Sequence, residues 1–453
     1  MKIKTIHITA QLLLFIAHCS GNTSTDALTT SVRQKKPWTI MIYMAATNDL
    51  AIFAPRNILQ MQKIGSNDLV NIAVQHNFYE KNDTASKTFL IKEGAKTLIS
   101  ENYNQTDCGE AQTLINFCTE IINKFPAEHY ALILWNHGTG ALEPVFRSNL
   151  SIAELFSFSE SQDLFSNPSK ALSFLPIYET NIIKETHKGI CFNDSTNKFM
   201  NEQQLCLALK TICATGLNNQ KIDILAFDAC FMAMVEVALA VEPYADIMVA
   251  SQDVERGTGW NYQYALCPFL VTSPSPKELG SHFVRAYGKA YKKIKGFTQS
   301  CILLHDLKGL SNNISKIASL LQQAATQQEN KNVRDIIKLS RNKHLCTHFD
   351  EPDFIDLKHF YKNLSSSIAT ISLEENSVVA HIVAQLQKEL LEGEIMLNAT
   401  IYENSTGQAF PDACGLSIYF PEGAIHSSYK KTAFASQTYW NSFLKAHLSG
   451  QKK

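Results

Sequence analysis

The sequence predicts an α/β fold: a wound, mostly parallel sheet flanked by helices and followed by a C-terminal α+β region. Short apolar runs alternate with stretches of helical periodicity over residues 38–250, which is the pattern of buried parallel strands joined by helices. The chain has 453 residues, of which 45% are hydrophobic and 18% charged, so it can bury a large core. After about residue 300 the composition shifts to Gln- and Asn-rich helical stretches.

The predicted strands are short apolar runs bounded by residues that favour turns. Residues 38–45 form the first strand, because this run lies between Pro37 and the polar residues Thr47–Asp49. An unbroken apolar run indicates a strand that is buried on both faces. The same reasoning gives the other strands: 70–74, 88–91 on a hairpin, 130–135, 222–227, 247–250, 302–304 and 415–421.

Helices are predicted where apolar residues recur at every third or fourth position. Residues 50–64 show this spacing, and so do residues 110–124, 201–214, 232–241, stretches within 310–340, and 376–393. In wound sheets, ligands bind beyond the carboxyl ends of the strands. We therefore expect the functional residues where these strands end.

The chain divides into a targeting segment, a tether and two folded regions. We expect a signal or lipoprotein-type peptide at 1–19, a Ser/Thr/Asn-rich tether at 20–36, a catalytic domain at 37–300 and a C-terminal domain at 301–453. Residues 141–188 interrupt the strand–helix alternation. We interpret them as an insertion or processing loop, since structureless loops this long are uncommon and tend to be functional. An inert surface insertion is the alternative.

The N-terminus carries the pattern of an export signal. Residues 6–17 are a mostly apolar run after a basic start, too short to span a bilayer but typical of a signal-peptide core. The sequence up to Cys19 resembles a bacterial lipoprotein signal, in which the cysteine is acylated. We therefore expect a secreted or envelope protein with a lipid anchor at Cys19. A cytosolic protein with an apolar N-terminal segment is the alternative.

Charge and cysteine content narrow the function classes. Lys and Arg number 41 against 42 Asp and Glu, a net charge of −1, which argues against a nucleic-acid binder. The 11 cysteines are an odd number without a CxxC motif, so at least one is not in an intramolecular disulfide and a structural zinc site is disfavoured. We expect no resident metal.

Two strand ends carry residues suited to nucleophilic catalysis. The strand ending at Trp135 is followed by His137 and two glycines, and the strand ending at Phe227 is followed by Cys230. Histidine is a base near neutral pH, and a thiol close to a helix N-terminus is biased toward the thiolate. Strand ends of one sheet can bring this pair together. Taken singly, a buried structural cysteine and a structural histidine are the alternatives.

Several blocks resemble the clostripain family of cysteine peptidases, of the caspase-like clan that includes gingipain, legumain and separase. They are residues 38–50, 129–138 (HYALILWNHG), 223–233 (DILAFDACFMA), 250–260 (ASQDVERGTGW) and 415–421 (GLSIYFP). The resemblance spans about residues 37–421 and implies a caspase-like fold. Residues 189–194 also resemble the family strand that resumes the sheet after the insertion.

The resemblance implies roles for individual residues. Cys230 matches the nucleophile and His137 the general base, with no third member of a triad evident. The main-chain N–H groups of Gly138 and Cys230 are the expected oxyanion donors. Asp228 matches the acid of the primary specificity pocket, where it would pair with Arg or Lys. A helix N-cap is the alternative for Asp228.

Other residues are weaker candidates. Asp253 and Glu255 could add to the specificity pocket or be solvated loop acids, and Trp260 could wall the cleft or belong to the core. Family members are commonly activated by cleavage between the His and Cys blocks, so Arg147 is the first candidate for self-cleavage. Some relatives need calcium, and the scattered acids Asp194 and Asp350–Asp353 do not form an EF-hand loop. Calcium therefore remains undetermined, and no other cofactor is expected.

The sequence thus predicts a secreted, lipid-anchored bacterial cysteine endopeptidase. It would hydrolyse peptide bonds after Arg or Lys through a Cys/His dyad. We expect protein or peptide substrates, no nucleic-acid partner, membrane contact only through the anchor, and a monomer. One alternative is an inactive surface-binding relative. Another is a thiol-dependent transpeptidase or ligase on the same fold.

Overall fold

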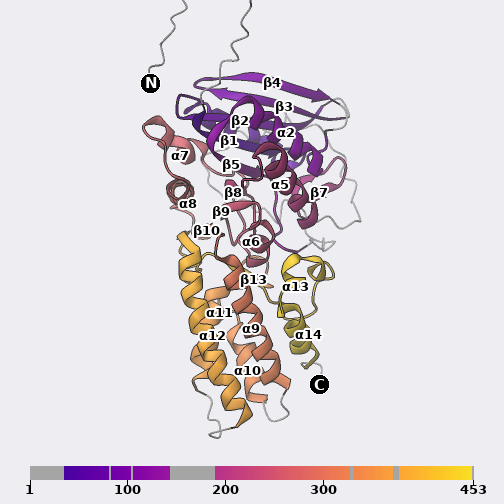
Figure 1. Cartoon of the computed structure of the whole chain (residues 1–453), viewed down its shortest axis with the longest axis vertical. Coiled ribbons are helices and arrows are strands. Elements are labelled where there is room, and N and C mark those ends of the chain that lie inside the picture. Colours follow the sequence, from indigo (N-terminus) through magenta and orange to yellow (C-terminus); the bar gives the residue numbers. More distant parts are fainter. Residues whose placement is uncertain are drawn as a thin grey trace, which may run out of the picture. The chain divides into compact units, whose positions relative to one another are not determined.

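The computed structural model (Figure 1) describes residues 35–80, 83–103, 106–142, 189–326, 331–370 and 377–450. The predicted signal peptide with Cys19, most of the 141–188 insertion, and Arg147 within it lie outside these residues. Residues 35–453 group into one compact unit. Among the described helices, none is both long and apolar enough to traverse a lipid bilayer.

A nine-stranded sheet forms the centre of this unit, in the order β12-β10-β9-β8-β5-β1-β2-β3-β4. The five strands from β9 to β2 are parallel, and the strands outside them are antiparallel. The predicted wound, mostly parallel sheet is therefore confirmed. The strands are β1 (Lys36–Ala45), β2 (Val70–Glu80), β3 (Asp83–Lys92), β4 (Ala95–Tyr103), β5 (Ala127–Trp135), β8 (Ile222–Asp228), β9 (Ala245–Ala250), β10 (Thr298–Leu303) and β12 (Ile401–Thr406).

Both faces of the sheet are covered, because alternate side chains of the central strands enter two separate cores. On β1, Met41 and Tyr43 belong to one core, and Ile40 and Ile42 to the other. The first core holds α2 (Ala111–Lys124), α5 (Glu202–Gly216) and α6 (Val235–Val241). The second holds η1 (Asp49–Phe53), α1 (Ala54–Met61), α7 (Tyr262–Leu266), η3 (Cys267–Leu270) and α8 (Pro276–Tyr291).

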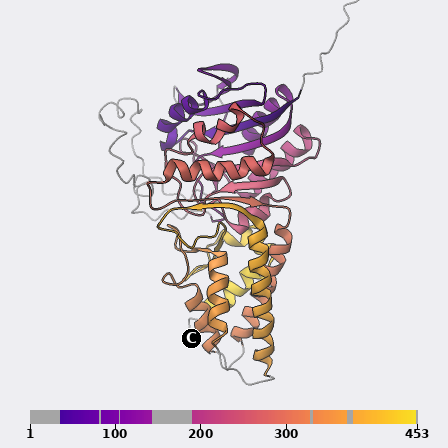
Figure 2. The same cartoon turned by 90° about the vertical axis from the view of Figure 1, so that its left-hand side faces the viewer.

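The C-terminal helices extend the first core. In Figures 1 and 2 they form a bundle at the β10 side of the sheet, opposite β4. The bundle comprises α9 (Leu307–Thr326), α10 (Lys331–Ser340), α11 (Leu357–Ile368), α12 (Val378–Thr400) and α14 (Trp440–Gly450), with η4 (Tyr429–Lys431) and α13 (Ala433–Gln437) nearby. The strands β11 (Phe354–Asp356) and β13 (Ser417–Tyr419) pair in a separate two-stranded sheet. A bridge between Ser417 and Met234 links this sheet to the turn before α6.

Three local expectations need correction. Residues 50–64 are not one helix, because a 3₁₀ turn (η1) precedes α1, which has Pro55 in its first turn. The helix after Cys230 begins at Val235 rather than residue 232. The segment 189–194 does not rejoin the main sheet, since β6 (Ile190–Asn193) pairs with β7 (Lys198–Met200) in a sheet of its own.

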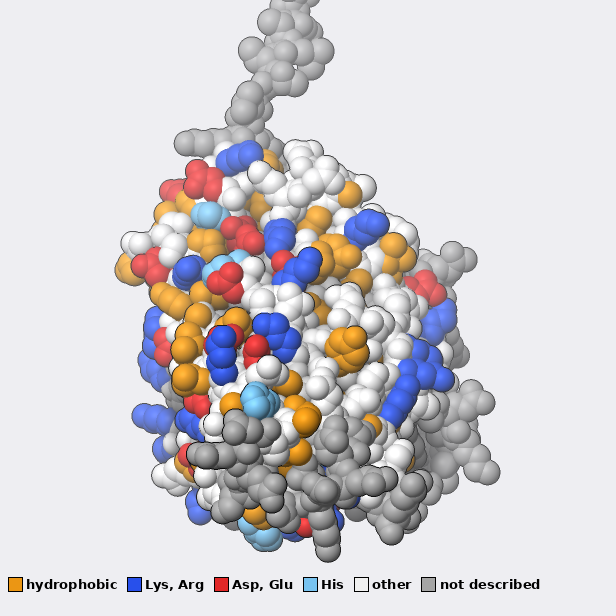
Figure 3. Space-filling view, turned by 60° about the horizontal axis from the view of Figure 1, so that its bottom comes forward, with side chains coloured by type: hydrophobic (Ala, Val, Ile, Leu, Met, Phe, Trp, Pro, Cys, Tyr) orange, Lys and Arg blue, Asp and Glu red, His pale blue; other side chains and the backbone are white. Residues whose placement is uncertain are grey.

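Basic and acidic side chains are interspersed on the face drawn in Figure 3. Hydrophobic side chains lie between them in small groups. This mixture agrees with the balanced composition of the chain.

Candidate active site

The carboxyl ends of β1, β5 and β8 meet at one edge of the sheet. In the parallel register, Met44 on β1 lies opposite Trp135 on β5, and Trp135 lies opposite Asp228 on β8. The chain segments beyond these ends therefore carry His137 and Cys230 to the same edge. Both residues line one small cleft of ≈ 280 Å³, together with Leu50, Trp135, Asn136, Asp228, Ala229, Glu255, Arg256, Gly257 and Gly259.

The turn after β5 is fixed by Asn136, whose side chain is buried. Its Nδ2 donates to the carbonyls of Ala45 (2.5 Å) and Phe192 (3.2 Å), and its Oδ1 accepts from Phe192 N at 2.7 Å. The next glycine packs against the cysteine segment. A Cβ at Gly138 would lie 2.5 Å from the Cys230 carbonyl oxygen. Glycine is therefore required for the histidine turn to approach the cysteine turn this closely.

The His137 side chain is mostly buried and is held by Asp49. Its Nε2 lies 2.6 Å from Asp49 Oδ1, and 12% of the His137 side chain is exposed. The Phe192 ring stands edge-on to the imidazole at 6.4 Å. Burial raises the pKa of Asp194 to about 6; the Asp49 charge raises this pKa further, and the His137 charge lowers it.

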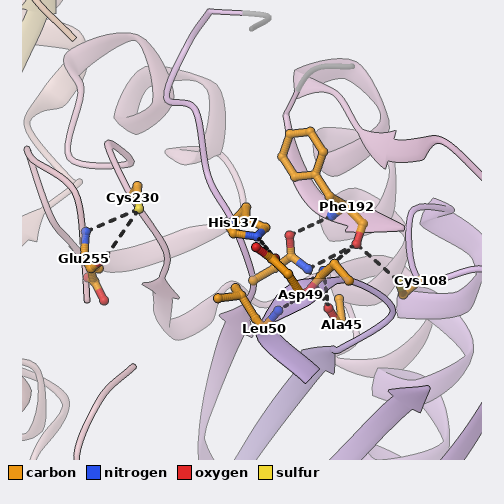
Figure 4. A network of polar contacts seen from close by, with 10 residues as sticks. Ala45, Asp49, Leu50, Cys108, His137, Phe192, Cys230 and Glu255 are labelled. Carbon is orange, nitrogen blue, oxygen red and sulfur yellow. Dashed lines mark hydrogen bonds and ion pairs between the residues drawn. The ribbon is translucent and has the colours of Figure 1, made fainter. Parts of the chain in front are cut away.

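The Cys230 thiol lies in the wall of the cleft and is held by the main chain of Glu255. The N–H of Glu255 donates to Sγ at 3.3 Å, and the Glu255 carbonyl lies 3.8 Å from Sγ. Figure 4 shows the imidazole turned towards Asp49 while the thiol lies beside Glu255. Burial raises the pKa of Cys230, and the nearby carboxylates raise it further. The thiol is therefore neutral in this arrangement.

The structure corrects two expectations about the residues around Cys230. The N-cap of α6 is Met234, so neither Cys230 nor Asp228 stands at a helix N-terminus. The thiolate bias expected from a helix dipole is absent, and the N-cap interpretation of Asp228 is wrong. Instead, Cys230 precedes a turn in which Phe231 has φ +61°, a backbone conformation that is uncommon outside glycine and often found at functional sites.

Asp228 forms a buried pair of carboxyl groups with Glu255. Asp228 accepts hydrogen bonds from Trp260 N (3.0 Å) and from the Tyr262 hydroxyl (2.8 Å). Burial raises the pKa of Asp228 to about 6. Burial raises the pKa of Glu255, and the Asp228 charge and a side-chain hydrogen bond with Asp228 raise it further. The two carboxyl groups therefore oppose each other's ionisation.

Asp253 and Trp260 lie beside the cleft rather than among the residues that line it. Asp253 Oδ1 accepts from Asp350 N at 2.9 Å, and its carbonyl accepts from Phe231 N at 3.2 Å. The Trp260 side chain is buried and packs against Phe283. Both residues thus fix the loop that carries Glu255.

Asp49 is the site residue that sequence reasoning missed. It follows β1, the neighbour of β5, so the rule that parallel strand ends meet at one edge could have indicated it. The described ranges contain no group of three or more His, Cys, Asp or Glu residues arranged to hold a metal ion.

Comparison with known proteins gives the family. The profile of the clostripain family matches residues 42–165 and 177–447. The chain belongs to the clostripain family. Clostripain of Hathewaya histolytica is 29% identical over 163 residues, which are 35% of this chain and 24% of that protein. The matched segment thus spans about a quarter of that relative's length.

Solved structures of clostripain-family proteases share the fold. An inactive zymogen C11 protease from Parabacteroides distasonis has a TM-score of 0.58 at 17% identity, over 90% of this chain and 99% of its own. A secreted C11 cysteine protease from Bacteroides thetaiotaomicron, in complex with an irreversible peptide inhibitor, has a TM-score of 0.56 at 18% identity, over 90% and 99%. The predicted family of cysteine peptidases and its caspase-like fold are therefore confirmed.

Proposed function

We propose that this clostripain-family protein is a cysteine endopeptidase that cleaves after basic residues through Cys230 and His137. The observation that carries the proposal is that both side chains line one cleft together with the Asp228 carboxyl group. A thiol, an imidazole and a buried acid at one sheet edge are the parts that thiol catalysis with a basic specificity pocket requires.

In this mechanism His137 takes the Cys230 proton as the sulfur attacks the peptide carbonyl carbon. The oxyanion formed would accept from the main-chain N–H groups of Gly138 and Cys230, which lie on two closely packed turns. His137 then gives the proton to the leaving amine, and water hydrolyses the acyl-enzyme. Burial raises the pKa of Cys230, whereas the hydrogen bond from the Glu255 N–H lowers it, so this contact favours the thiolate that forms as the proton moves.

Basic specificity is assigned to the Asp228–Glu255 pair. Two carboxyl groups that line a buried pocket suit a guanidinium or ammonium group, which would supply the opposite charge. Asp228 is positioned by Trp260 and Tyr262. Asp253, which lies beside the cleft, remains a proposed contributor through the loop that it supports.

The test is cleavage of peptides that contain Arg or Lys by the purified full chain. We expect hydrolysis after these residues, its loss in Cys230→Ala and His137→Ala, and covalent labelling of Cys230 by an arginyl chloromethyl ketone. Cys267→Ala is the matched control, since that partly buried thiol lies outside the cleft. Absence of both cleavage and labelling would leave an inactive binding relative. Ligated products in the mass spectrum would indicate a transpeptidase.

The remaining proposals concern location and maturation. We propose export, anchoring through acylated Cys19, self-cleavage at Arg147, a monomeric state and no cofactor. The similar fold of a protease described as secreted supports export, and the signal-like residues 1–19 support anchoring. Mass spectrometry of the mature protein would report its N-terminus, any acyl group and any internal cut together.

A further inference from the structure

The hydrogen bond between His137 and Asp49 shows how the imidazole is fixed in the cleft. Nε2 of His137 and Oδ1 of Asp49 are 2.6 Å apart, a distance typical of a charge-assisted hydrogen bond. A carboxylate can only accept, so the Nε2–H group donates. Proton exchange with the thiol and with the leaving amine is thereby directed to Nδ1.

The turn that carries Asp49 is itself fixed by hydrogen bonds. The side chain of Asn48 donates to the carbonyls of Ala45 (3.0 Å) and Phe192 (2.8 Å) and accepts from Leu50 N (3.1 Å). These bonds tie the start of η1 to the end of β1 and to β6. The aspartate therefore meets the imidazole from a fixed main chain, although 43% of its own side chain is exposed.

Asp194 is a second acid that interacts electrostatically with both Asp49 and His137. Its main-chain N–H donates to Thr47 O at 2.9 Å, which fixes the segment that carries it. The other ionisable or charged groups that line the cleft are Asp228, Cys230, Glu255 and Arg256.

We propose that Asp49 is the positioning residue of His137, a third functional member beside the pair. The inference rests on the proposed peptidase function. Asp49 holds the Nε2–H tautomer, orients Nδ1 for the thiol proton, and stabilises the imidazolium that forms when Cys230 Sγ bonds to the carbonyl carbon. The proton then passes from Nδ1 to the amine nitrogen as the C–N bond breaks, so that His137 returns to its neutral form.

Two substitutions separate orientation from charge. Asp49→Asn retains an oxygen that can accept from Nε2–H but loses the charge, whereas Asp49→Ala loses both. We expect kcat to fall about 100-fold or more in Asp49→Ala, since general acid–base catalysis contributes about 10²–10⁴-fold, and to fall less in Asp49→Asn. KM should change little in both. The matched control is Asp306→Asn, because Asp306 pairs with His305 at 3.0 Å on the exposed surface.

A second readout does not depend on activity. In the Cys230→Ala full chain labelled with ¹⁵N-histidine, the ring-nitrogen shifts of His137 report which nitrogen carries the proton. We expect an Nε2–H ring in the parent and in Asp49→Asn, and a mixture of tautomers in Asp49→Ala. Unchanged His137 shifts in Asp49→Ala would overturn the inference. A kcat of Asp49→Ala within about twofold of the wild-type value would overturn it too. If the wild type cleaves no peptide, the proposed function fails while the shifts still decide the role of Asp49.

Discussion

At the scale of single residues, the cleft combines a buried thiol with a pair of buried acids. Asp228 and Glu255 are both buried, and burial is the main reason why the pKa of each is raised. A carboxyl whose pKa is raised in the folded state stabilises the fold most below its unfolded pKa. That contribution is lost as pH rises through the folded pKa. The pair therefore lowers the free energy of unfolding at neutral pH and above.

Replacing one acid by its amide should recover this stability. In Glu255→Gln the side chain keeps its shape and can donate an N–H to Asp228, while the titrating carboxyl group with the raised pKa is removed. In the Cys230→Ala background we expect the free energy of unfolding at pH 8 to be roughly 1–3 kcal/mol higher than in the parent. At pH 4 the two free energies of unfolding should be nearly equal. Urea unfolding at the two pH values measures this. Glu93→Gln, at an exposed turn, serves as the control and should change neither value.

The principal site residues could be predicted from sequence, but their partners could not. His137 and Cys230 follow buried apolar strands, so their shared edge follows from parallel strand order alone. The contacts of Asp49 and of the Glu255 main chain depend on the turn at η1 and on the loop after β9. The conformations of these segments are set by long-range bonds, such as those of Asn48 to Phe192 and of Asp350 to Asp253.

At the scale of elements, the turns after β5 and β8 must approach each other closely for the site to form. Gly138 makes this possible, because a Cβ there would meet the Cys230 carbonyl oxygen at 2.5 Å and the Ala229 Cβ at 3.1 Å. The obstacle on the cysteine side is main chain, in a turn that is fixed by the bonds of Phe231 N to Asp253 O and of Ala233 N to Ser251 O, so it cannot rotate away as a side chain could. Any side chain at residue 138 must therefore separate the two turns.

We expect Gly138→Ala to reduce peptide cleavage by about 10- to 100-fold while the far-ultraviolet circular dichroism stays unchanged. The reason is that a misplacement of about 1 Å can cost on the order of 10²-fold in rate. Gly309→Ala is the control, since a Cβ at this position in α9 meets no atom within 4 Å. It should leave activity unaltered and stabilise the helix by roughly 0.5–1 kcal/mol. Full activity of Gly138→Ala would show that the spacing of the turns is not critical.

The central elements were predictable because they are buried, and the edge elements were not. The neighbouring strands β9, β8, β5 and β1 in the centre of the sheet are apolar runs. β4 shows no clear apolar alternation, since most of its residues are exposed, and β12 is a short, largely polar edge strand. The helix α8 was not predicted, although its sequence carries a signal for a helix start. This signal is a capping box, in which the Ser275 side chain accepts from Glu278 N and the Glu278 side chain accepts from Ser275 N. Residues after 230 form a turn because main-chain bonds to Asp253 and Ser251 replace the first helical turn.

At the scale of the whole molecule, the described carboxyl groups with a raised pKa outnumber the described histidines with a lowered pKa. Among the described residues, burial is the main cause of a raised pKa at nine carboxyl groups: about 6 for Asp194, Asp228 and Asp253, about 7 for Glu202 and Glu236, and above the ordinary value for Asp246, Glu255, Asp353 and Asp356. Three histidines act in the opposite sense, because burial lowers the pKa of His76 and of His447 to about 4 and also lowers the pKa of His282.

The sign of the pH dependence follows from these two sets. Between about pH 4 and pH 7 these nine acids bind more protons in the folded state than in the unfolded state, so they stabilise the fold as pH falls. The three histidines bind more protons when unfolded, and they destabilise the fold as pH falls below about 6.5. Because nine groups oppose three, the acids dominate in the upper part of the range.

We therefore expect the full chain, studied as Cys230→Ala to prevent self-digestion, to melt at a higher temperature at pH 5.5 than at pH 8. Glu236→Gln should reduce this difference. Glu236 Oε1 accepts from Tyr419 N and from the Tyr429 hydroxyl, both at 3.0 Å, and the amide oxygen can keep both bonds while the titrating proton is removed. Differential scanning calorimetry across this range measures the effect. A melting temperature that is constant, or that falls on acidification, would mean that these acids are hydrated in solution rather than buried.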